Sequence, residues 1–184
     1  VTTSPYSLAT PEYKTQVRMF SSEQGIYIGI TNFQPQSSQL SPRSARDAAI
    51  NADFNNIVID FDNGGVEAYR FSVGNGGSLS DGTFSNENSY SSEWNGVWYA
   101  KTSADEQHWY TEVLIPWDVA PMALTENGQR ALGFHVERYV ASQQKLFASQ
   151  ALHQSRQRFL SDIKPVVVKD HAKASLQTFV SVTA

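Results

Sequence analysis

The stretch Asn56–Gly65, NIVIDFDNGG, decides the fold class more clearly than any other part of the chain. Ile57, Ile59 and Phe61 occupy every second position, and polar or smaller residues lie between them. This alternation is typical of a strand with one buried face. The tripeptide Asn63-Gly64-Gly65 then favours a tight hairpin, because Asn and Gly tolerate positive φ. The stretch therefore predicts a strand that turns into an antiparallel neighbour.

The same period of two recurs on both sides of this stretch and predicts further strands. These are at 13–20 and 26–30 (a hairpin), 69–73, 96–101, 108–115 and 132–140, with 166–168 and 176–182 as a last strand or a linker. We expect long loops at 32–54 and 74–96, helical turns near 45–50 and 117–130, and partial helix over 142–163. Many strands with little helical periodicity indicate an all-β fold, an antiparallel β-sandwich of jelly-roll or immunoglobulin-like type.

The length of 184 residues suits one domain, 1–184. We expect its core at about 13–140, with 142–184 as a linker-like C-terminal segment. Charged residues make up only 17% of the chain and the net charge is −4 without a basic stripe, which argues against a nucleic-acid partner. Cysteine is absent, and no apolar run approaches the roughly 20 residues of a transmembrane helix. Abundant Ser, Asn, Gln and Thr hint at an exported protein.

Asp60 and Asp62 form one candidate for chemistry. Paired carboxylates can act as acid and base on glycosides or bind Ca²⁺, but this segment lacks the later ligands of an EF-hand loop. The simpler interpretation is two solvated carboxylates at a hairpin. Arg138 lies on the apolar face of its strand and needs a partner such as Glu112 or Asp60, so we expect a structural ion pair or a strand-edge residue rather than a ligand clamp.

The other classes of catalytic or metal site find little support. The four histidines lack metal-ligand spacing, and no nucleotide-binding or nucleophile-elbow motif is present. Acidic residues in the loops nevertheless leave a structural Ca²⁺ open, with Asp47, Asp53 and Asp81 as candidate ligands.

The aromatic residues give a candidate ligand site. Trp94 and Tyr90 lie in a polar loop, and such rings can stack on the apolar face of a sugar while polar neighbours bond its hydroxyls. The predicted ligand-binding residues are Trp94, Tyr90, Asn88, Glu93, Asn95 and Trp117. An equally good interpretation is that Trp94 folds back onto the sandwich and anchors the loop.

An ordered series of short motifs resembles the family-9-like carbohydrate-binding modules found at the amino-terminal end of bacterial outer-membrane-associated proteins. The motifs are Ile26-Tyr27-Ile28-Gly29, Arg46-Asp47, Asp53, Ile57-Val58-Ile59-Asp60, Tyr69-Arg70-Phe71, Trp94-Asn95-Gly96-Val97-Trp98, Trp109-Tyr110-Thr111-Glu112-Val113-Leu114-Ile115-Pro116 and Gly133-Phe134-His135-Val136-Glu137-Arg138. The Asp-Gly and Trp that usually precede the family's first strand are missing before Tyr13.

The resemblance implies a non-catalytic module that binds a poly- or oligosaccharide. It also implies a larger parent chain in the periplasm, in the outer membrane or outside the cell. Two alternatives remain from the sequence: a structural or interaction domain that packs on the rest of a membrane-associated protein, and, more remotely, a glycoside hydrolase that uses Asp60 and Asp62.

Overall fold

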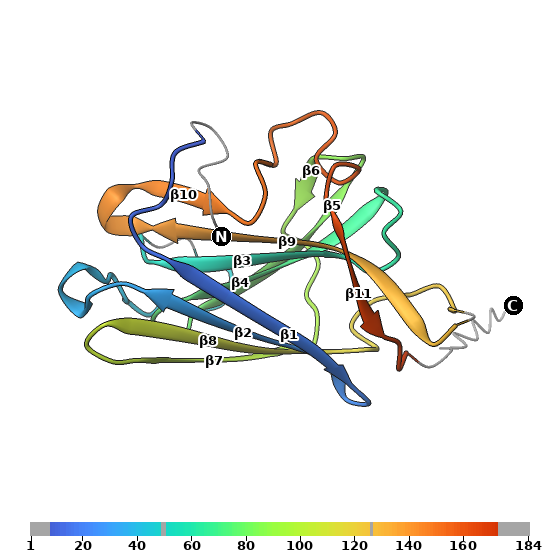
Figure 1. Cartoon of the computed structure of the whole chain (residues 1–184), viewed down its shortest axis with the longest axis horizontal. Helices are drawn as coiled ribbons and strands as arrows, with labels where there is room; N and C mark the ends of the chain where they lie inside the picture. Colours follow the sequence, from blue (N-terminus) through green and yellow to red (C-terminus); the bar gives the residue numbers. More distant parts are fainter. Residues whose placement is uncertain (1–7, 49–50, 126, 173–184) are drawn as a thin grey trace, which may run out of the picture.

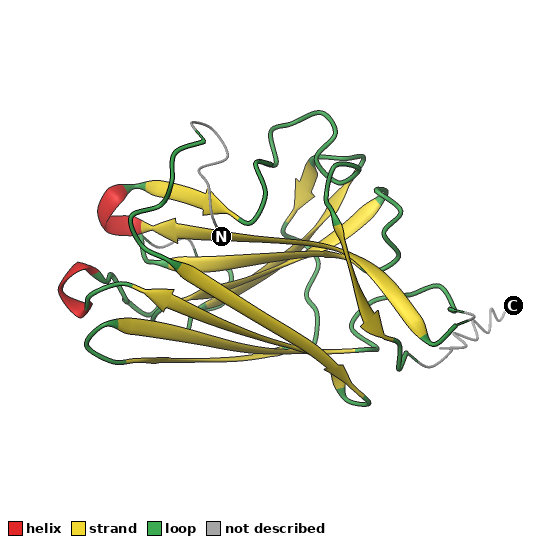
Figure 2. Ribbon diagram, in the orientation of Figure 1, coloured by secondary structure: helices red, strands yellow, loops and turns green. Residues whose placement is uncertain are grey.

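Two antiparallel sheets pack face to face in the computed structural model, which describes residues 8–48, 51–125 and 127–172. Figure 1 shows them as two layers, and the side chains of the main hydrophobic core come from both sheets. Nearly all regular structure in these described ranges is strand, with two short 3₁₀ turns, η1 (Gln36–Ser38) and η2 (Ala141–Gln143), as Figure 2 shows. The chain is thus the predicted antiparallel β-sandwich. No helix within the described ranges is long and apolar enough to span a membrane.

The smaller sheet has the strand order β1-β2-β8-β7. Its strands are β1 (Thr15–Ser22), β2 (Gly25–Phe33), β7 (Tyr99–Ala104) and β8 (His108–Pro116). The larger sheet has the order β10-β9-β3-β4-β5-β6, and β11 pairs with the first half of β9. Its strands are β3 (Phe54–Asp60), β4 (Glu67–Gly74), β5 (Leu79–Ser85), β6 (Ser89–Ser91), β9 (Gln129–Val140), β10 (Lys145–Ala148) and β11 (Pro165–Lys169).

The apolar positions of the alternating segments face each other across the sandwich. The main core contains Ile26, Ile28, Ile30, Ile57, Ile59, Phe61, Phe71, Val73, Val113, Ile115, Leu132 and Val136. A second cluster covers part of the outer face of the larger sheet, under the loop that joins β10 to β11. It consists of Val58, Ala68, Phe84, Leu152, Phe159, Leu160 and Ile163. The sandwich therefore has an outer layer over part of its larger sheet.

Three segments differ from the sequence predictions. Residues 74–96 carry β5 and β6, which apolar periodicity under-reports because the inward positions Asp81 and Thr83 of β5 are polar. Residues 142–163 form β10 and turns rather than a partial α-helix. The segment after Val140 supplies β10 and β11 to the larger sheet, and the predicted strand at 176–182 lies outside the described residues.

Asp60 and Asp62 have separate structural roles. Asp60 is buried at the end of β3, and its carboxylate accepts hydrogen bonds from the backbone N–H of Asp62 and Gly65. Asp62 lies beyond the strand and pairs with Arg130 at 2.8 Å. Their lone pairs are thus engaged by the hairpin and by a neighbouring arginine, and the two side chains do not act as a pair.

Arg138 is fully buried between the sheets, as its place on an apolar face predicted, but the expected carboxylate partner is wrong. Its guanidinium donates to the Lys14 carbonyl at 3.1 Å, Thr15 Oγ1 at 2.8 Å and Gln34 Oε1 at 2.7 Å. Burial lowers the pKa of Arg138 to about 10, partly offset by Asp53, so the group stays charged at neutral pH. A buried cation therefore joins β9 to the start of β1 and to the residue that follows β2.

Replacing Arg138 by leucine should lower the free energy of unfolding by about 3 kcal/mol or more, because several buried acceptors lose their donor. The matched control is Arg18→Leu on the exposed face of β1, which should change it by less than about 0.5 kcal/mol. Urea denaturation of both variants measures the difference. Similar losses for the two variants would contradict the role assigned to Arg138.

Candidate functional site

The outward side chains of β3, β4, β5 and β9 form three parallel rows on the larger sheet. The strand register places Ser80, Ser72, Asn56 and Glu137 in one row across the four strands. The row on one side contains Phe54 and Tyr139, and the row on the other contains Arg70. A polar strip thus runs between an aromatic pair and a cation.

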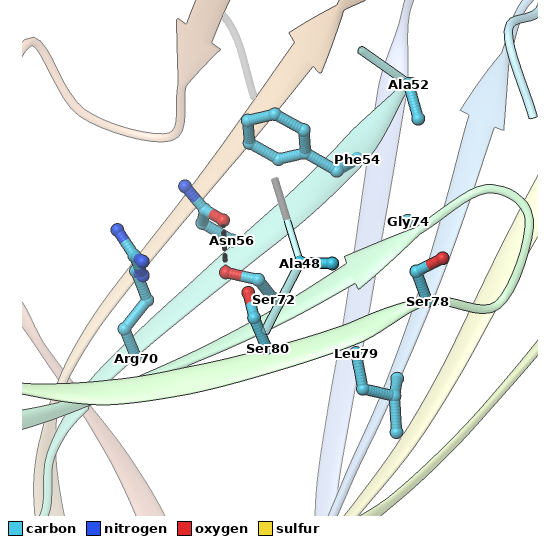
Figure 3. A pocket seen from close by; sticks show the side chains of 10 residues that line it. All are labelled: Ala48, Ala52, Phe54, Asn56, Arg70, Ser72, Gly74, Ser78, Leu79 and Ser80. Atoms are coloured by element: carbon cyan, nitrogen blue, oxygen red, sulfur yellow. Dashed lines mark hydrogen bonds between the residues drawn. The ribbon is translucent and has the colours of Figure 1, made fainter. Parts of the chain in front are cut away.

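A groove of about 290 Å³ opens over these rows. Its lining residues are Ala48, Ala52, Phe54, Asn56, Arg70, Ser72, Gly74, Ser78, Leu79 and Ser80. Figure 3 shows Phe54, Asn56 and Arg70 on the same side of the sheet, whereas Leu79 points to the opposite side. The volume is at the small end of ligand pockets, and the mixture of apolar wall and convergent polar groups is typical of them.

Buried partners fix the orientation of the Asn56 amide. Its Nδ2 donates to Glu137 Oε2 at 2.9 Å, and its Oδ1 accepts from Ser72 Oγ at 2.6 Å. Burial alone would raise the pKa of Glu137, but the nearby His135 ring and the Asn56 hydrogen bond lower it below its ordinary value. Glu137 is therefore an ionised acceptor that holds Asn56 in one orientation at the floor of the groove.

The Arg70 guanidinium stacks on an aromatic ring at the end of the groove. Its central carbon lies 3.7 Å from the centroid of Tyr90, which is short for a cation–π contact. The Tyr90 hydroxyl in turn donates to the Asp81 carbonyl at 3.1 Å. Tyr90 crosses Gly82 so closely that a Cβ on Gly82 would lie 2.5 Å from the Tyr90 hydroxyl oxygen. The missing side chain of Gly82 thus allows Tyr90 to support Arg70.

Phe54 lines the apolar side of the groove, and Tyr139 stacks on it from the neighbouring strand. Their rings stack with centroids 5.0 Å apart and planes 19° apart, and both side chains are partly exposed. Such a pair offers carbon surface beside the polar strip, the combination that a sugar ring requires.

Of the aromatic residues predicted from sequence to bind ligand, Trp94 and Trp117 lie away from the groove. Tyr90 contacts the groove residue Arg70. Trp94 is half-buried and packs edge-on against Tyr69 and Phe71, with ring centroids 4.8 Å and 5.9 Å apart. Trp117 is 8% exposed, and its indole N–H donates to the Ser22 carbonyl. These contacts favour the loop-anchor interpretation of Trp94 and place Trp117 in the main core, and ligand binding by either residue stays a prediction.

The predicted polar partners of Trp94 are exposed on the same loop or near it. Asn88 lies in the turn between β5 and β6, and Asn95 donates to the Glu93 carbonyl in a local turn. None of Asn88, Glu93 and Asn95 lines the groove. Binding by this loop remains a prediction.

The candidate calcium ligands serve other partners. Asp53 is fully buried and accepts from the N–H of Leu40 and Ala141, and Asp81 is fully buried and accepts from Arg46 at 2.7 Å. Asp47 Oδ1 accepts from the Asp81 N–H. Within the described ranges no three His, Asp or Glu side chains gather as a metal site would require.

Sequence reasoning missed Phe54, Asn56, Ser72 and Ser80 as site residues. The available signal was Arg70 between Tyr69 and Phe71, a cation on the outward side of a strand whose inward side is aromatic. Only the strand register shows that this cation borders a polar row.

A second exposed surface lies on the outer face of the smaller sheet. Phe20, Tyr27, Leu114 and Tyr99 are in register across β1, β2, β8 and β7, and Phe20 and Tyr99 are 61% and 58% exposed. The Phe20 and Tyr27 rings stack with centroids 4.9 Å apart. These side chains form a contiguous exposed apolar patch, unlike single exposed apolar residues, which are common on protein surfaces.

No protein-family model and no curated protein matches the chain, but solved structures are similar to it. A protein of Bacteroides uniformis ATCC 8492, provisionally described as carbohydrate-binding, matches 86% of this chain over 79% of its own length, with 11% identity and a TM-score of 0.64. A family-9 carbohydrate-binding module of Caldicellulosiruptor kristjanssonii in complex with cellotriose matches 92% of this chain over 84% of its own, with 13% identity and a TM-score of 0.56.

A family-9 module of the same organism in complex with glucose matches 95% of this chain over 86% of its own, with 14% identity and a TM-score of 0.53. The chain therefore has the fold of family-9 carbohydrate-binding modules, as the motif series predicted.

Replacing Gly82 by alanine should destabilise the protein by about 1–3 kcal/mol, because the new Cβ would lie 2.3 Å from the Ser91 carbonyl oxygen and displace Tyr90. Gly29→Ala is the matched control: it also lies in a strand, and nothing is within 4 Å of the added Cβ. The control should be neutral or stabilising by up to about 1 kcal/mol. Equal denaturation midpoints for the two variants would refute the contact.

Proposed function

We propose that this chain is a non-catalytic carbohydrate-binding module whose ligand site is the groove on the larger sheet. The observation that carries the proposal is the polar row of Ser80, Ser72 and Asn56 between the Phe54–Tyr139 pair and Arg70. Hydroxyl and amide groups can bond sugar hydroxyls while the aromatic wall covers carbon-bound hydrogens. Asn56 is pre-oriented by Glu137, so little ordering is needed on binding.

Two further facts support a non-catalytic module with a sugar ligand. The fold is that of family-9 modules, of which two solved examples hold cellotriose and glucose. The carboxylates singled out for catalysis, Asp60 and Asp62, are engaged in structural contacts. The composition, rich in Ser, Asn, Gln and Thr, supports placing the module in a larger exported or outer-membrane protein, acting in the periplasm or outside the cell.

A polysaccharide panel tests the site by affinity electrophoresis. The double variant Asn56→Ala/Ser80→Ala should weaken retention roughly thirtyfold, because it removes two hydrogen-bonding groups worth about 1 kcal/mol each. The control Glu93→Ala/Asn95→Ala alters the exposed loop beside Trp94 and should leave retention unchanged. Thermal melts check that both variants are folded.

Two results would overturn this assignment. Wild-type protein that binds none of the polysaccharides would remove the proposed function. Loss of retention in the loop variant, with normal retention in the groove variant, would instead move the site to the loop around Trp94.

The exposed aromatic row on the smaller sheet favours a second candidate, an interaction domain that packs on the rest of a larger protein. In that case hydrogen exchange of β7 amides should be slower in the longer chain than in this domain alone, since an adjoining surface would cover Tyr99 and its neighbours. Equal exchange rates in the two proteins would count against it.

A further inference from the structure

The charge of Arg70 has no counter-charge in the described part of the chain. No carboxylate there lies within ion-pairing distance of its guanidinium, and its Nε is buried without a hydrogen-bond acceptor. Two other arginines have carboxylate partners: Arg46 pairs with Asp81 at 2.7 Å, and Arg130 pairs with Asp62 at 2.8 Å and Asp170 at 3.0 Å. A desolvated donor without a partner is costly, so Arg70 is suited to a partner that arrives from outside.

The groove is cationic although the whole chain is not. Arg70 is the one charged residue among the ten that line it, whereas the chain has a net charge of −4. The carboxylate nearest in the register, Glu137, is 5% exposed and already accepts from Asn56. An anionic ligand would therefore meet an uncompensated positive charge and no exposed carboxylate in the lining.

The guanidinium is also held in place before binding. Tyr90 stacks under it at 3.7 Å and is itself tied to the Asp81 carbonyl. A guanidinium presents a planar fork of N–H donors that matches a carboxylate through two parallel hydrogen bonds. Ser72, Ser78, Ser80 and Asn56 border the same groove and supply groups for neutral hydroxyls.

We propose that the groove selects an acidic sugar, a uronic acid residue whose carboxylate binds Arg70 while its hydroxyls bind the serines and Asn56. This inference rests on the proposed carbohydrate-binding function and names its ligand class. A neutral sugar would leave the Arg70 charge without a counter-charge, and a charge-assisted pair formed in this groove gains about a factor of ten or more in affinity.

Isothermal titration with two matched ligands tests the inference: an oligogalacturonide, and the same oligosaccharide after its carboxyl groups have been reduced to alcohols. Wild-type protein should bind the acidic form at least about tenfold more tightly, with an advantage that shrinks as salt is added. Arg70→Gln should bind both forms equally. Arg70→Lys should keep part of the preference, because it keeps the charge but loses the fork.

The control Arg18→Gln, on the exposed face of β1, should keep the wild-type preference, and thermal melts should show every variant folded. Equal affinity of wild-type protein for both ligands would overturn the acidic-sugar inference and leave the proposed function standing. Binding of neither ligand, nor of any polysaccharide on the panel, would overturn both. Tight binding of a sulfated galactan oligosaccharide without binding of the uronate would overturn the carboxylate assignment.

Discussion

The buried guanidinium of Arg138 is the interaction on which the two-sheet arrangement depends. It donates to groups at the start of β1 and to Gln34, just after β2, from a strand in the middle of the opposite sheet. Gln34 also accepts from the Trp109 indole at 3.2 Å and donates to Asp53 at 3.1 Å. A charge in this position is tolerated only if each neighbour supplies an acceptor, so the polar cluster fixes how the sheets align.

The same cluster positions the outer face. Asp53 immediately precedes Phe54, and its carboxylate accepts from the Leu40 N–H and from the Ala141 N–H at the end of β9. The ends of β3 and β9 are therefore held together where Phe54 and Tyr139 stack. Because side chains alternate along a strand, the bonds that bury Arg138 also place Glu137 and Tyr139 outward. Phe54, Asn56, Arg70, Ser72 and Ser80 thus lie on strands, which gives the site a defined geometry.

Alternation was sufficient to predict the sandwich, the β1–β2 and β3–β4 hairpins and the inward position of Arg138. It could not predict β5, where the inward residues Asp81 and Thr83 are polar, or the added strands after Val140. The site depends on register between distant segments: Asn56 and Glu137 are 81 positions apart in the chain, and no local pattern joins them. The role of Trp94 could not be predicted either, because a Trp in a polar loop looks the same in sequence whether it anchors the loop or binds a sugar.

The central claim is that ligand binds on the outer face of the larger sheet. The most direct measurement is nuclear magnetic resonance of the labelled protein during titration with the oligosaccharide that it retains most strongly. We predict that the largest amide shift changes fall on Asn56, Arg70, Ser72 and Ser80, with little change across β1 and β7. Shift changes concentrated in the loop 88–98, or on the aromatic row of the smaller sheet, would contradict the claim.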